Sequence, residues 1–482
     1  TLAFRLVNKI FFRRQQKFIY FYSHSTRAYI LICQSQGRTL FKMVQKSDFS
    51  SIPEFYAGKS VFITGGTGFL GKALIEKLLY SCKDIGKVFM LIREKKGVSA
   101  QDRIQKTYYN LFTILRKLRP QDLKKIVPVY GDLVAEWLGI SAEDQEMLVE
   151  EVSVVFHLAA TIKFNEPLSV AMKVNVEGTR EVLKLAQKMK QLQSFVYMST
   201  AFSNTSLNRF HVEEIIYPPP KPMTEVYEMI NNNDPKERFN AEVLDGRPNT
   251  YTFTKALAEN FVVDNHGDIP SVIIRPSVVT AAVQEPAKGW IDNWQGATPV
   301  LSLIAKGWVR TLYGDKSYNF EIIPIDYVVN LTIISGAKSK DVPVYHCCSS
   351  GSNPVTLKQT SNLYTEEGLK HGFSKFFKYS FVLTYLRSLS YHRGNNNYEI
   401  FFFRYVKIQT KLSFYLDTIR FFSSQSWNIT NNKTRALYTS LNPADKKLYP
   451  CDANLINWKE YIPIYFRGVK RFLVDPSEKK KQ

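Results

Sequence analysis

Short apolar runs alternate with longer amphipathic stretches over residues 60–279. Buried strands of a parallel sheet read as continuous apolar runs, and the helices that cover them show apolar positions three and four residues apart. The alternation therefore predicts an α/β fold around a parallel sheet. The predicted strands are Val61–Thr64, Lys87–Arg93, Ile126–Leu133, Val152–Ala160, Gln193–Ala201 and Ser271–Val279.

The first predicted strand runs into a glycine-rich turn, TGGTGFLGK, in which Gly65, Gly68 and Gly71 fall three apart. Lys72–Tyr80 then continues with helical periodicity. Glycine lets such a turn tighten and lets the backbone approach a pyrophosphate, to which the helix N-terminus offers N–H groups. Strand, turn and helix in this order favour a dinucleotide site in a Rossmann-type, doubly wound sheet over a turn that binds nothing.

The ends of the next strands carry residues that suit the rest of a dinucleotide. Arg93 ends the second strand, where an acidic residue binds the ribose of NAD and a basic one pairs with the 2′-phosphate of NADP. A solvated basic turn is the alternative. Asp132 ends the third strand and is able to accept from the adenine amino group. Ala159 and Ala160 end the fourth strand and are small enough for close approach of the cofactor.

Two polar residues within packed patterns are predicted to be structural. His157 lies in an apolar run, which favours a hydrogen-bonded core histidine over a catalyst. Asn175 interrupts a helical pattern over Val170–Met189. A bond from Asn175 to a backbone carbonyl is favoured there over a part in a proton relay.

Hydroxyl and amino groups that suit catalysis come later in the pattern. Ser199 and Thr200 stand at the carboxyl end of the fifth strand, the edge at which open parallel sheets bind ligands; strand-end capping is the alternative. Tyr251 and Lys255 lie four apart, on one face of a predicted helix. A neighbouring ammonium lowers the pKa of a phenol from ~10 toward neutrality, which predicts Tyr251 as general acid and Lys255 also as a ligand of the nicotinamide ribose. The residues placed to touch the nicotinamide end are Pro276, Ser277 and Val278.

Composition adds a strong positive charge. The 482 residues carry a formal net charge of +21, which favours anionic partners such as cofactor phosphates, coenzyme A or acidic lipid headgroups. No nucleic-acid-binding motif accompanies the charge, so no nucleic-acid partner is expected. Five cysteines without the spacing of a metal site indicate reduced thiols in a cytosol-facing compartment. No apolar run approaches the ~18–20 residues needed to cross a bilayer.

Residues 1–42 form a basic extension, and no acidic residue precedes Asp48. Basic, acid-poor segments are typical of organelle targeting or of contact with a membrane surface. The alternative, which we favour, is that Met43 is the true start and that residues 1–42 are non-native or disordered. Residues from Met43 onward make a short lead into the first strand of the predicted sheet.

These stretches together resemble the extended short-chain dehydrogenase/reductase superfamily, and most closely its alcohol-forming fatty acyl-CoA reductases. The resemblance covers roughly Ile52–Val355 and rests on TGGTGFLGK, LIREKKG, VPVYGDL, VFHLAATIKFNEPL, KVNVEGTREVL, FVYMSTAFSN, YTFTKALAE and RPSVVTAAVQEPAKGWIDNWQGATPVL. The last of these lies outside the generic cofactor fold and resembles this family in particular. Residues 43–355 are therefore expected to form an NADP-binding Rossmann domain with smaller substrate-binding insertions.

The resemblance implies a role for each matching residue. Tyr251 and Lys255 would form the catalytic pair, with Thr200 at the family's Ser/Thr position and Ser199 in reserve. No metal is expected. NADPH would lie against Thr64, Gly65, Gly68, Phe69, Leu70, Gly71, Arg93, Asp132, Leu133, Ala159, Ala160, Lys255, Pro276, Ser277 and Val278.

The implied reaction is NADPH-dependent reduction of a long-chain fatty acyl-CoA to a primary fatty alcohol through an enzyme-bound aldehyde. Two alternatives stay open. One is a dehydrogenase of the same fold acting on a sterol or a sugar nucleotide, against which TAAVQEPAKGWIDNWQG speaks. The other is an NADP-binding protein with impaired catalysis. The expected location is a membrane surface, peroxisomal or of the endoplasmic reticulum, with the active site facing the cytosol.

Residues 356–482 resemble the family's mostly helical C-terminal domain, with Trp427, Trp458, Tyr461 and Gly468 at recognisable places. Between residues 371 and 409 the family's long apolar helical segment is not recognisable. The stretch there is aromatic and basic and is interrupted by GNNN. A divergent membrane-surface segment and a shortened or mis-assembled gene product both stay open.

Overall fold

The computed structural model describes residues 10–13, 16–23, 28–35, 38–45, 50–93, 113–206, 209–232, 244–307, 309, 312–338, 340–372, 410, 416–417 and 419–474. The chain divides into two compact units, Thr1–Phe55 and Tyr56–Gln482. The divergent stretch over residues 373–409 lies outside the described residues.

The first unit contains an antiparallel sheet in the order β1-β2-β3-β4. Met43, the expected start, lies inside its last strand and pairs with Ile30 of the strand before. The segment for which a targeting or non-native role was weighed thus carries strands. They are β1 (Ile10–Arg13), β2 (Gln16–Ser23), β3 (Ala28–Ser35) and β4 (Arg38–Gln45), followed by α1 (Ile52–Tyr56).

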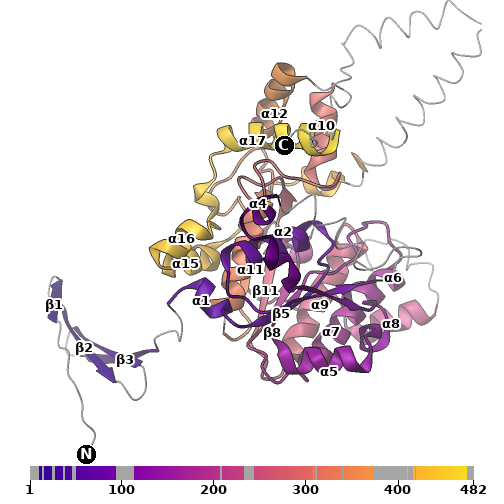
Figure 1. Ribbon diagram of the computed structural model, residues 1–482. Helices are drawn as coiled ribbons and strands as arrows, with labels where there is room; N and C mark the ends of the chain where they lie inside the picture. Colours follow the sequence, from indigo (N-terminus) through magenta and orange to yellow (C-terminus); the bar gives the residue numbers. More distant parts are fainter. Residues whose placement is uncertain are drawn as a thin grey trace, which may run out of the picture. The chain divides into compact units, whose positions relative to one another are not determined.

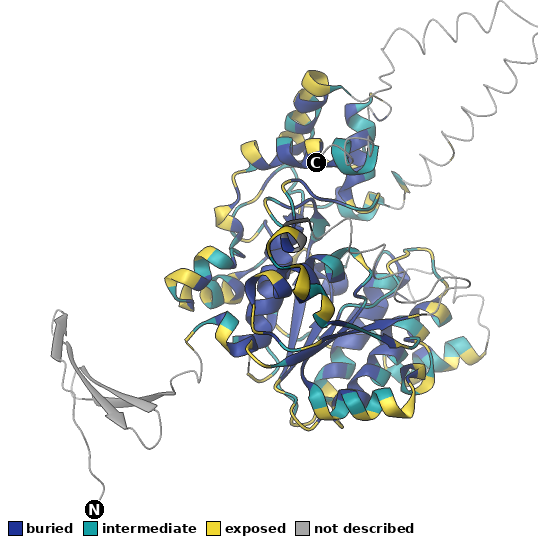
Figure 2. Ribbon diagram, in the orientation of Figure 1, coloured by how far each residue is buried: buried dark blue, intermediate teal, exposed yellow. Residues whose placement is uncertain are grey.

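A seven-stranded sheet in the order β14-β11-β9-β8-β5-β6-β7 forms the centre of the second unit. All its pairings are parallel. Figure 2 shows these strands as the buried interior of the unit, as expected for apolar runs with helices on both sides. The strands are β5 (Ser60–Thr64), β6 (Val88–Ile92), β7 (Ile126–Tyr130), β8 (Val152–His157), β9 (Ser194–Met198), β11 (Ser271–Pro276) and β14 (Val344–Cys347).

Helices cover both faces of this sheet (Figure 1). On one face α2 (Phe69–Ser81) packs against α11 (Ile325–Lys338). On the other face α9 (Thr250–Asn265) packs against α7 (Gly178–Ala186), which also contacts α5 (Ala142–Glu151). Helices α4 (Thr113–Leu118), α6 (Leu168–Met172) and α8 (Met223–Asn231) complete this part.

The rest of the second unit is mostly helical, as predicted. Within it α12 packs against α10 and α17. Two short parallel pairings, β10 with β15 and β12 with β13, join distant parts of the chain. These elements are β10 (His211–Val212), β12 (Val278–Thr280), α10 (Ala297–Ala305), β13 (Ile322–Pro324), α12 (Leu357–His371), β15 (Asn428–Ile429), α15 (Asn432–Ser440), α16 (Pro443–Leu448) and α17 (Trp458–Val469).

The doubly wound sheet is confirmed, with two corrections to its elements. The strand predicted over Ser271–Val279 ends at Pro276, and Val278 starts a separate strand that pairs with β13 instead. The helix predicted over Val170–Met189 is α6 and α7 joined by one π-helical turn, Lys173–Glu177. In both places the apolar pattern continues across a change in backbone geometry, so periodicity alone does not reveal it.

Candidate active site

The strand order reverses between β5 and β8, which lie side by side in the sheet although β6 and β7 separate them in the chain. In open parallel sheets this switch point, at the carboxyl ends of the strands, is where ligands bind. Thr64 pairs with His157 across it. The predicted site residues at the ends of β5, β8 and β9 therefore meet at one edge.

The glycine turn at this edge is tight because four of its residues, Gly65, Gly66, Gly68 and Gly71, lack a side chain. Gly65 has φ +73°, and a Cβ there would lie 2.8 Å from the backbone nitrogen of Ala159. A Cβ on Gly71 would lie 2.3 Å from the carbonyl oxygen of Gly65. Gly68 donates its N–H to that same carbonyl at 2.9 Å and caps α2.

No side chain in the described part of the chain caps α2 at its start. The N–H groups of its first turn, including those of Phe69 and Leu70, therefore point out of the helix end. The positive end of the helix dipole lies at the same place. A pyrophosphate is the anion that such an end accommodates. The turn fits the dinucleotide that the sequence predicts.

His157 is a core histidine with both ring nitrogens bonded, as predicted. Thr179 gives its hydroxyl proton to the carbonyl of Asn175 at 2.7 Å, so His157 Nε2 donates to Thr179 at 2.9 Å. His157 Nδ1 then accepts from Thr64 Oγ1 at 2.7 Å, and Thr64 accepts from the N–H of Ala159 at 3.2 Å. Burial, with Lys255 nearby, lowers the pKa of His157 to about 3. The neutral ring thus fixes the edge between β5 and β8.

Asn175 bonds a backbone carbonyl, as predicted, and connects two parts of the site. Its amide accepts from the N–H of Thr161 at 2.9 Å and donates to the carbonyl of that residue at 3.2 Å. It also donates to Thr254 Oγ1 at 2.9 Å. The π-helical turn that carries Asn175 thereby joins the loop after β8 to α9, the helix of the Tyr–Lys pair.

Tyr251 is half-buried on the first turn of α9, and its phenol lies close enough to the hydroxyl of Thr200 for that hydroxyl to affect its pKa. Thr200 is the second residue after β9 and caps the short helix η4 (Ala201–Asn204), accepting from the N–H of Phe202 at 3.3 Å. The capping that the sequence offered as the alternative for Thr200 is therefore present, and its part in the reaction stays a prediction. The structure brings this hydroxyl and the phenol together at the sheet edge.

The pKa of Tyr251 moves against our expectation. Burial raises it to about 12, although the nearby Thr200 hydroxyl acts to lower it. Glu259 also raises it, and Lys255 does not offset these effects, because burial lowers the pKa of Lys255 itself to about 7. Its amino group, itself buried, donates to the carbonyl of Met198 at 2.7 Å and to the hydroxyl of Tyr197 at 3.2 Å. Because only part of the Lys255 amino groups are protonated near pH 7, this side chain does little to favour a phenolate at Tyr251.

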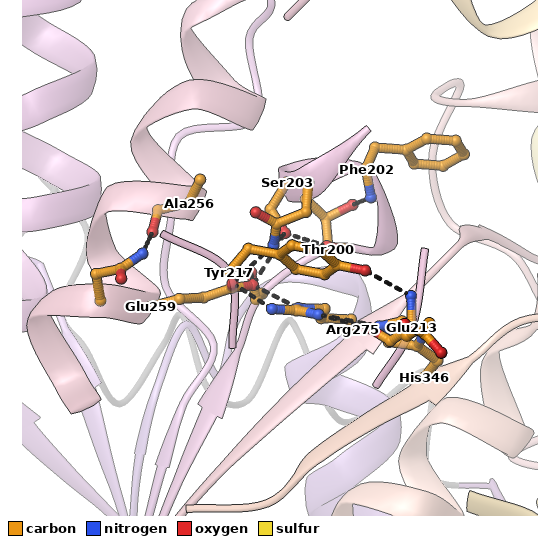
Figure 3. Close-up of polar contacts among 12 residues, drawn as sticks. Thr200, Phe202, Ser203, Glu213, Tyr217, Ala256, Glu259, Arg275 and His346 are labelled. Carbon is orange, nitrogen blue, oxygen red and sulfur yellow. Dashed lines mark hydrogen bonds and ion pairs between the residues drawn. The ribbon is translucent and has the colours of Figure 1, made fainter. Parts of the chain in front are cut away.

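Ser199 points into a buried polar cluster, where its hydroxyl donates to Glu259 Oε1. Figure 3 shows Glu259 facing Arg275, with Ser203 and Thr200 beside the pair. The guanidinium donates to both carboxylate oxygens, Nε to Oε1 at 2.9 Å and Nη2 to Oε2 at 2.7 Å. The sequence reasoning missed Glu259 and Arg275. An arginine in the apolar run SVIIRP was the available signal, because a buried charge requires a partner.

The remaining predicted residues lie at the ends of their strands. Arg93 follows β6 directly and is exposed. Asp132 accepts from the N–H of Val134 at 3.3 Å and stabilises the turn after β7, while Leu133 is buried in the core against Gly178. Ala160 follows Ala159 and is partly exposed, as a cofactor contact requires.

Pro276 is the last residue of β11. Ser277 follows it and is buried, and its N–H donates to the carbonyl of Cys347 at 3.0 Å.

Val278 packs against an aromatic cluster that the sequence reasoning did not foresee. The ring of Phe164 stacks on Tyr251 with centroids 6.1 Å apart and contacts Phe422 at 5.5 Å. The cluster consists of Phe164, Phe202, Phe210, Phe421, Phe422 and Trp427.

Two stretches of the chain, residues 63–332 and 381–476, match the NAD-binding and Sterile domains of the family described as Male sterility protein. The chain is 35% identical over 453 residues to Fatty acyl-CoA reductase 1 of Xenopus laevis, covering 88% of this chain and 86% of that one. It is 33% identical, with the same coverage, to Fatty acyl-CoA reductase 1 of Homo sapiens. The second matched stretch begins inside the segment that we described as divergent.

Solved structures support the fold. The terminal R domain of the myxalamid PKS-NRPS pathway aligns with a TM-score of 0.59 at 21% identity, covering 86% of this chain and 91% of that one. The reductase domain of a non-ribosomal peptide synthetase from Mycobacterium tuberculosis aligns with a TM-score of 0.57 at 18% identity and the same coverage. None of the described helices combines the length and the apolar character that crossing a bilayer requires.

Proposed function

The chain belongs to the fatty acyl-CoA reductase family, an oxidoreductase family with a nicotinamide cofactor, and on that premise we propose that it reduces long-chain acyl-CoA with NADPH at the edge that carries Tyr251. A primary fatty alcohol would be the product. Family membership favours this reaction over the sterol or sugar-nucleotide chemistry that the sequence left open.

The nearness of the Tyr251 phenol and the Thr200 hydroxyl at one edge of the sheet carries the proposal, since Thr200 is close enough to lower the pKa of Tyr251. The hydroxyls of Tyr251 and Thr200, side by side at this edge, can both donate to the carbonyl oxygen of a thioester. Negative charge develops on that oxygen in the transition state. Burial keeps Tyr251 protonated at neutral pH, which is the form that a general acid needs. Lys255, one turn further along α9, is proposed to hold the nicotinamide ribose.

NADPH held by the glycine turn and Lys255 would supply hydride to the substrate, one pair of electrons for each reduction. Tyr251 donates its proton to the carbonyl oxygen, and a hemithioacetal of the substrate forms. The carbon–sulfur bond then breaks, coenzyme A leaves as the thiolate, and the hydroxyl proton returns to Tyr251. The aldehyde stays at the same two hydroxyls for a second reduction, in which Tyr251 again protonates the oxygen to give the alcohol. The phenolate that remains takes up a proton from solvent.

NADPH rather than NADH is proposed because of Arg93, which follows β6 where the adenosine ribose lies in this fold. A guanidinium pairs well with a 2′-phosphate. Arg93→Gln is expected to raise the KM for NADPH by about 10-fold or more and to leave the KM for NADH nearly unchanged. Equal effects on the two cofactors would contradict the assignment of Arg93.

We also propose that the protein works at a membrane surface, of the peroxisome or the endoplasmic reticulum, with its active site facing the cytosol. The net charge of +21 and the poor solubility of a long acyl chain support this location. Flotation with vesicles of anionic and of neutral lipid tests the surface contact. Co-flotation is expected with anionic vesicles, and no flotation with either kind would contradict it.

The function is tested by incubating the purified protein with NADPH and a ladder of acyl-CoAs and separating the products by chromatography. Fatty alcohol and free coenzyme A are expected from long-chain substrates. Tyr251→Phe is expected to reduce turnover by about 100-fold or more. Tyr438→Phe serves as matched control, because it removes a phenol of α15 that donates to the Lys446 carbonyl of α16 at 3.2 Å and is no part of the proposed site. NADPH binding without thiol release by the wild type would favour the catalytically impaired alternative.

A further inference from the structure

Glu259 lies one helical turn after Lys255 and two turns after Tyr251, so the three side chains share one face of α9. Its carboxylate is almost completely buried, and so is the Arg275 guanidinium that it meets. We propose that the Glu259–Arg275 pair is a positioning device for the reaction, which fixes the end of β9 to α9 and so sets Thr200 against Tyr251. The proposal rests on the proposed function.

The donors to Glu259 come from three separate segments. Arg275, on β11, donates to both carboxylate oxygens. From the end of β9 and from η4, the hydroxyls of Ser199 and Ser203 donate to Oε1, and Asn204 Nδ2 donates to Oε2 at 3.1 Å. The carboxylate thus connects β11, the end of β9 and η4 to α9 (Figure 3).

Thr200 lies between two residues that this carboxylate fixes. Ser199 precedes it, and Ser203 donates its hydroxyl to the Thr200 carbonyl at 2.8 Å as well as to Glu259. On the other side of Ser199, the Met198 carbonyl accepts from Lys255. A change at Glu259 therefore reaches both the hydroxyl and the amino group that the reaction uses, without contact to the substrate.

Arg275 is held in turn on its far side. Its Nη1 donates to His346 Nε2 at 3.1 Å, and His346 Nδ1 donates to the carbonyl of Thr430 at 2.8 Å. Burial and the nearby guanidinium hold the pKa of His346 well below its usual value, so the imidazole is neutral and accepts. These contacts on both sides fix the orientation of the Arg275 guanidinium.

A buried ion pair is weak evidence for stability, because the loss of hydration offsets the attraction between its charges. Apolar residues of similar volume would hold α9 to the sheet as well. What apolar packing does not supply is direction: a bidentate guanidinium fixes the carboxylate, and the carboxylate fixes the hydroxyls that meet it. The cost of burying the pair is best explained by the precision that it gives to the neighbouring Thr200.

The pair also acts on Lys255 electrostatically. Lys255 contacts Tyr197 of β9 and interacts electrostatically with His157 of β8 and Glu259 of α9, and only Glu259 among these is anionic at neutral pH. Burial alone would raise the pKa of Glu259, but Arg275, Ser199 and Ser203 hold it below its usual value. The carboxylate therefore stays charged and raises the pKa of Lys255 against the effect of burial.

The experiment compares Glu259→Gln with Glu367→Gln in the full chain. Glu367 is also a buried carboxylate, paired at 2.7 Å with the half-exposed Arg467 between α12 and α17, and it is no part of the proposed site. The readouts are kcat and KM with palmitoyl-CoA, the melting temperature, and the affinity for NADPH as a function of pH, followed by fluorescence of the bound cofactor.

For Glu259→Gln, kcat is expected to fall about 10- to 100-fold, because a small displacement of the reacting groups has effects of this size. The KM for palmitoyl-CoA should change little. As pH rises, NADPH affinity should begin to fall at a lower pH than in the wild type, because Lys255 without the neighbouring carboxylate loses its proton at a lower pH. Glu367→Gln is expected to lower the melting temperature but to keep both kcat and the pH dependence.

An unchanged kcat in folded Glu259→Gln, or a loss that follows only the folded fraction with an unshifted pH dependence, would overturn the proposal. If Glu259→Gln does not fold, Arg275→Lys and Ser199→Ala replace it. The first keeps the charge but not the two parallel bonds, and the second removes one hydroxyl donor; wild-type kcat in both would also overturn the proposal. A wild type that releases no coenzyme A would refute the proposed function instead, and the pH dependence of NADPH binding would still test the positioning role.

Discussion

Lys72, on the first turn of α2, donates to Asp292 Oδ2 at 2.7 Å, although 220 residues separate the two in the chain. Asp292 belongs to the loop after β12 whose sequence resembles this family in particular. The ring of Trp290, in the same loop, lies 5.0 Å from that of Phe69 at the start of the same helix. An ion pair and a ring contact thus hold the family-specific loop against the helix that begins the glycine turn.

Because both partners are about one-fifth exposed, the ion pair is expected to contribute only about 0.5–1 kcal/mol to the free energy of unfolding. A double-mutant cycle with Lys72→Met and Asp292→Asn, followed by denaturation, measures this coupling. The exchanged pair Lys72→Asp with Asp292→Lys should recover part of the loss. Additive single effects, with no coupling, would show that the ring contact alone holds the loop.

Gly468 of α17 is predicted to accept no larger residue. A Cβ there would lie 1.8 Å from the carbonyl oxygen of Gly289, which is backbone and cannot rotate away. Gly468→Ala is therefore expected to cost at least about 2 kcal/mol, measured as a loss of melting temperature.

Gly368→Ala, on the neighbouring helix α12, is the matched control. There the nearest atom is Cε2 of the Phe466 side chain at 3.3 Å, which can shift by a few tenths of an ångström. Its effect should stay within about 1 kcal/mol, since alanine also favours the helix. Equal effects of the two substitutions would contradict the close backbone contact between α17 and the loop.

The fold could be predicted from the sequence because the signals that define it are local. The apolar runs marked the first six strands of the sheet, and TGGTGFLGK placed the turn between β5 and α2. Tyr251 and Lys255 were found by their spacing and Thr200 by its place at a strand end. What these signals cannot give is the direction of each side chain, and so Ser199 was weighed as a hydroxyl donor to substrate although it points to Glu259.

The aromatic cluster beside Tyr251 and the direction of its pKa shift could not be predicted for the same reason. Phe422 is 258 positions after Phe164 in the chain, and only the fold brings their rings within 5.5 Å. The spacing of Tyr251 and Lys255 puts them on one face of a helix, but it does not reveal that burial lowers the pKa of the lysine. Desolvation depends on every element around a group.

His157 is predicted to make the folded state sensitive to acid. Its pKa is about 3 in the folded chain and near the usual ~6.5 in the unfolded chain, so between these values the unfolded state binds the extra proton. The free energy of unfolding should therefore fall as pH falls below ~6.5, by up to about 1.4 kcal/mol per pH unit from this residue, and the decline should end near pH 3. Denaturation at a series of pH values measures the slope.

His157→Gln, which keeps a hydrogen-bonding side chain that does not titrate, should show a shallower slope than the wild type. His211→Gln, at an exposed histidine of β10, should keep the wild-type slope. Carboxylates contribute to acid denaturation in all three proteins, so the difference between slopes is the measurement. A slope unchanged by His157→Gln would mean that the imidazole is charged in the folded protein.

Lys255 is predicted to take up a proton when NADPH binds. Without cofactor its pKa is about 7, so at pH 8 most molecules carry the neutral amine. Hydrogen bonds to a ribose and the negative phosphates beside it favour the ammonium and raise that pKa. Binding at pH 8 should then draw up to about one proton from solution, and the affinity should weaken by up to about 10-fold per pH unit above 7.

Titration calorimetry in two buffers of different ionisation enthalpy measures this uptake directly. Lys255→Met should bind NADPH with the same enthalpy in both buffers. Lys338→Met is the control, because burial also lowers the pKa of Lys338, yet that residue ends α11 and is no part of the proposed site; its proton uptake should match the wild type. Equal enthalpies for the wild type in the two buffers would show that Lys255 is already charged before the cofactor arrives, and the lysine would then bind the ribose without any change of protonation.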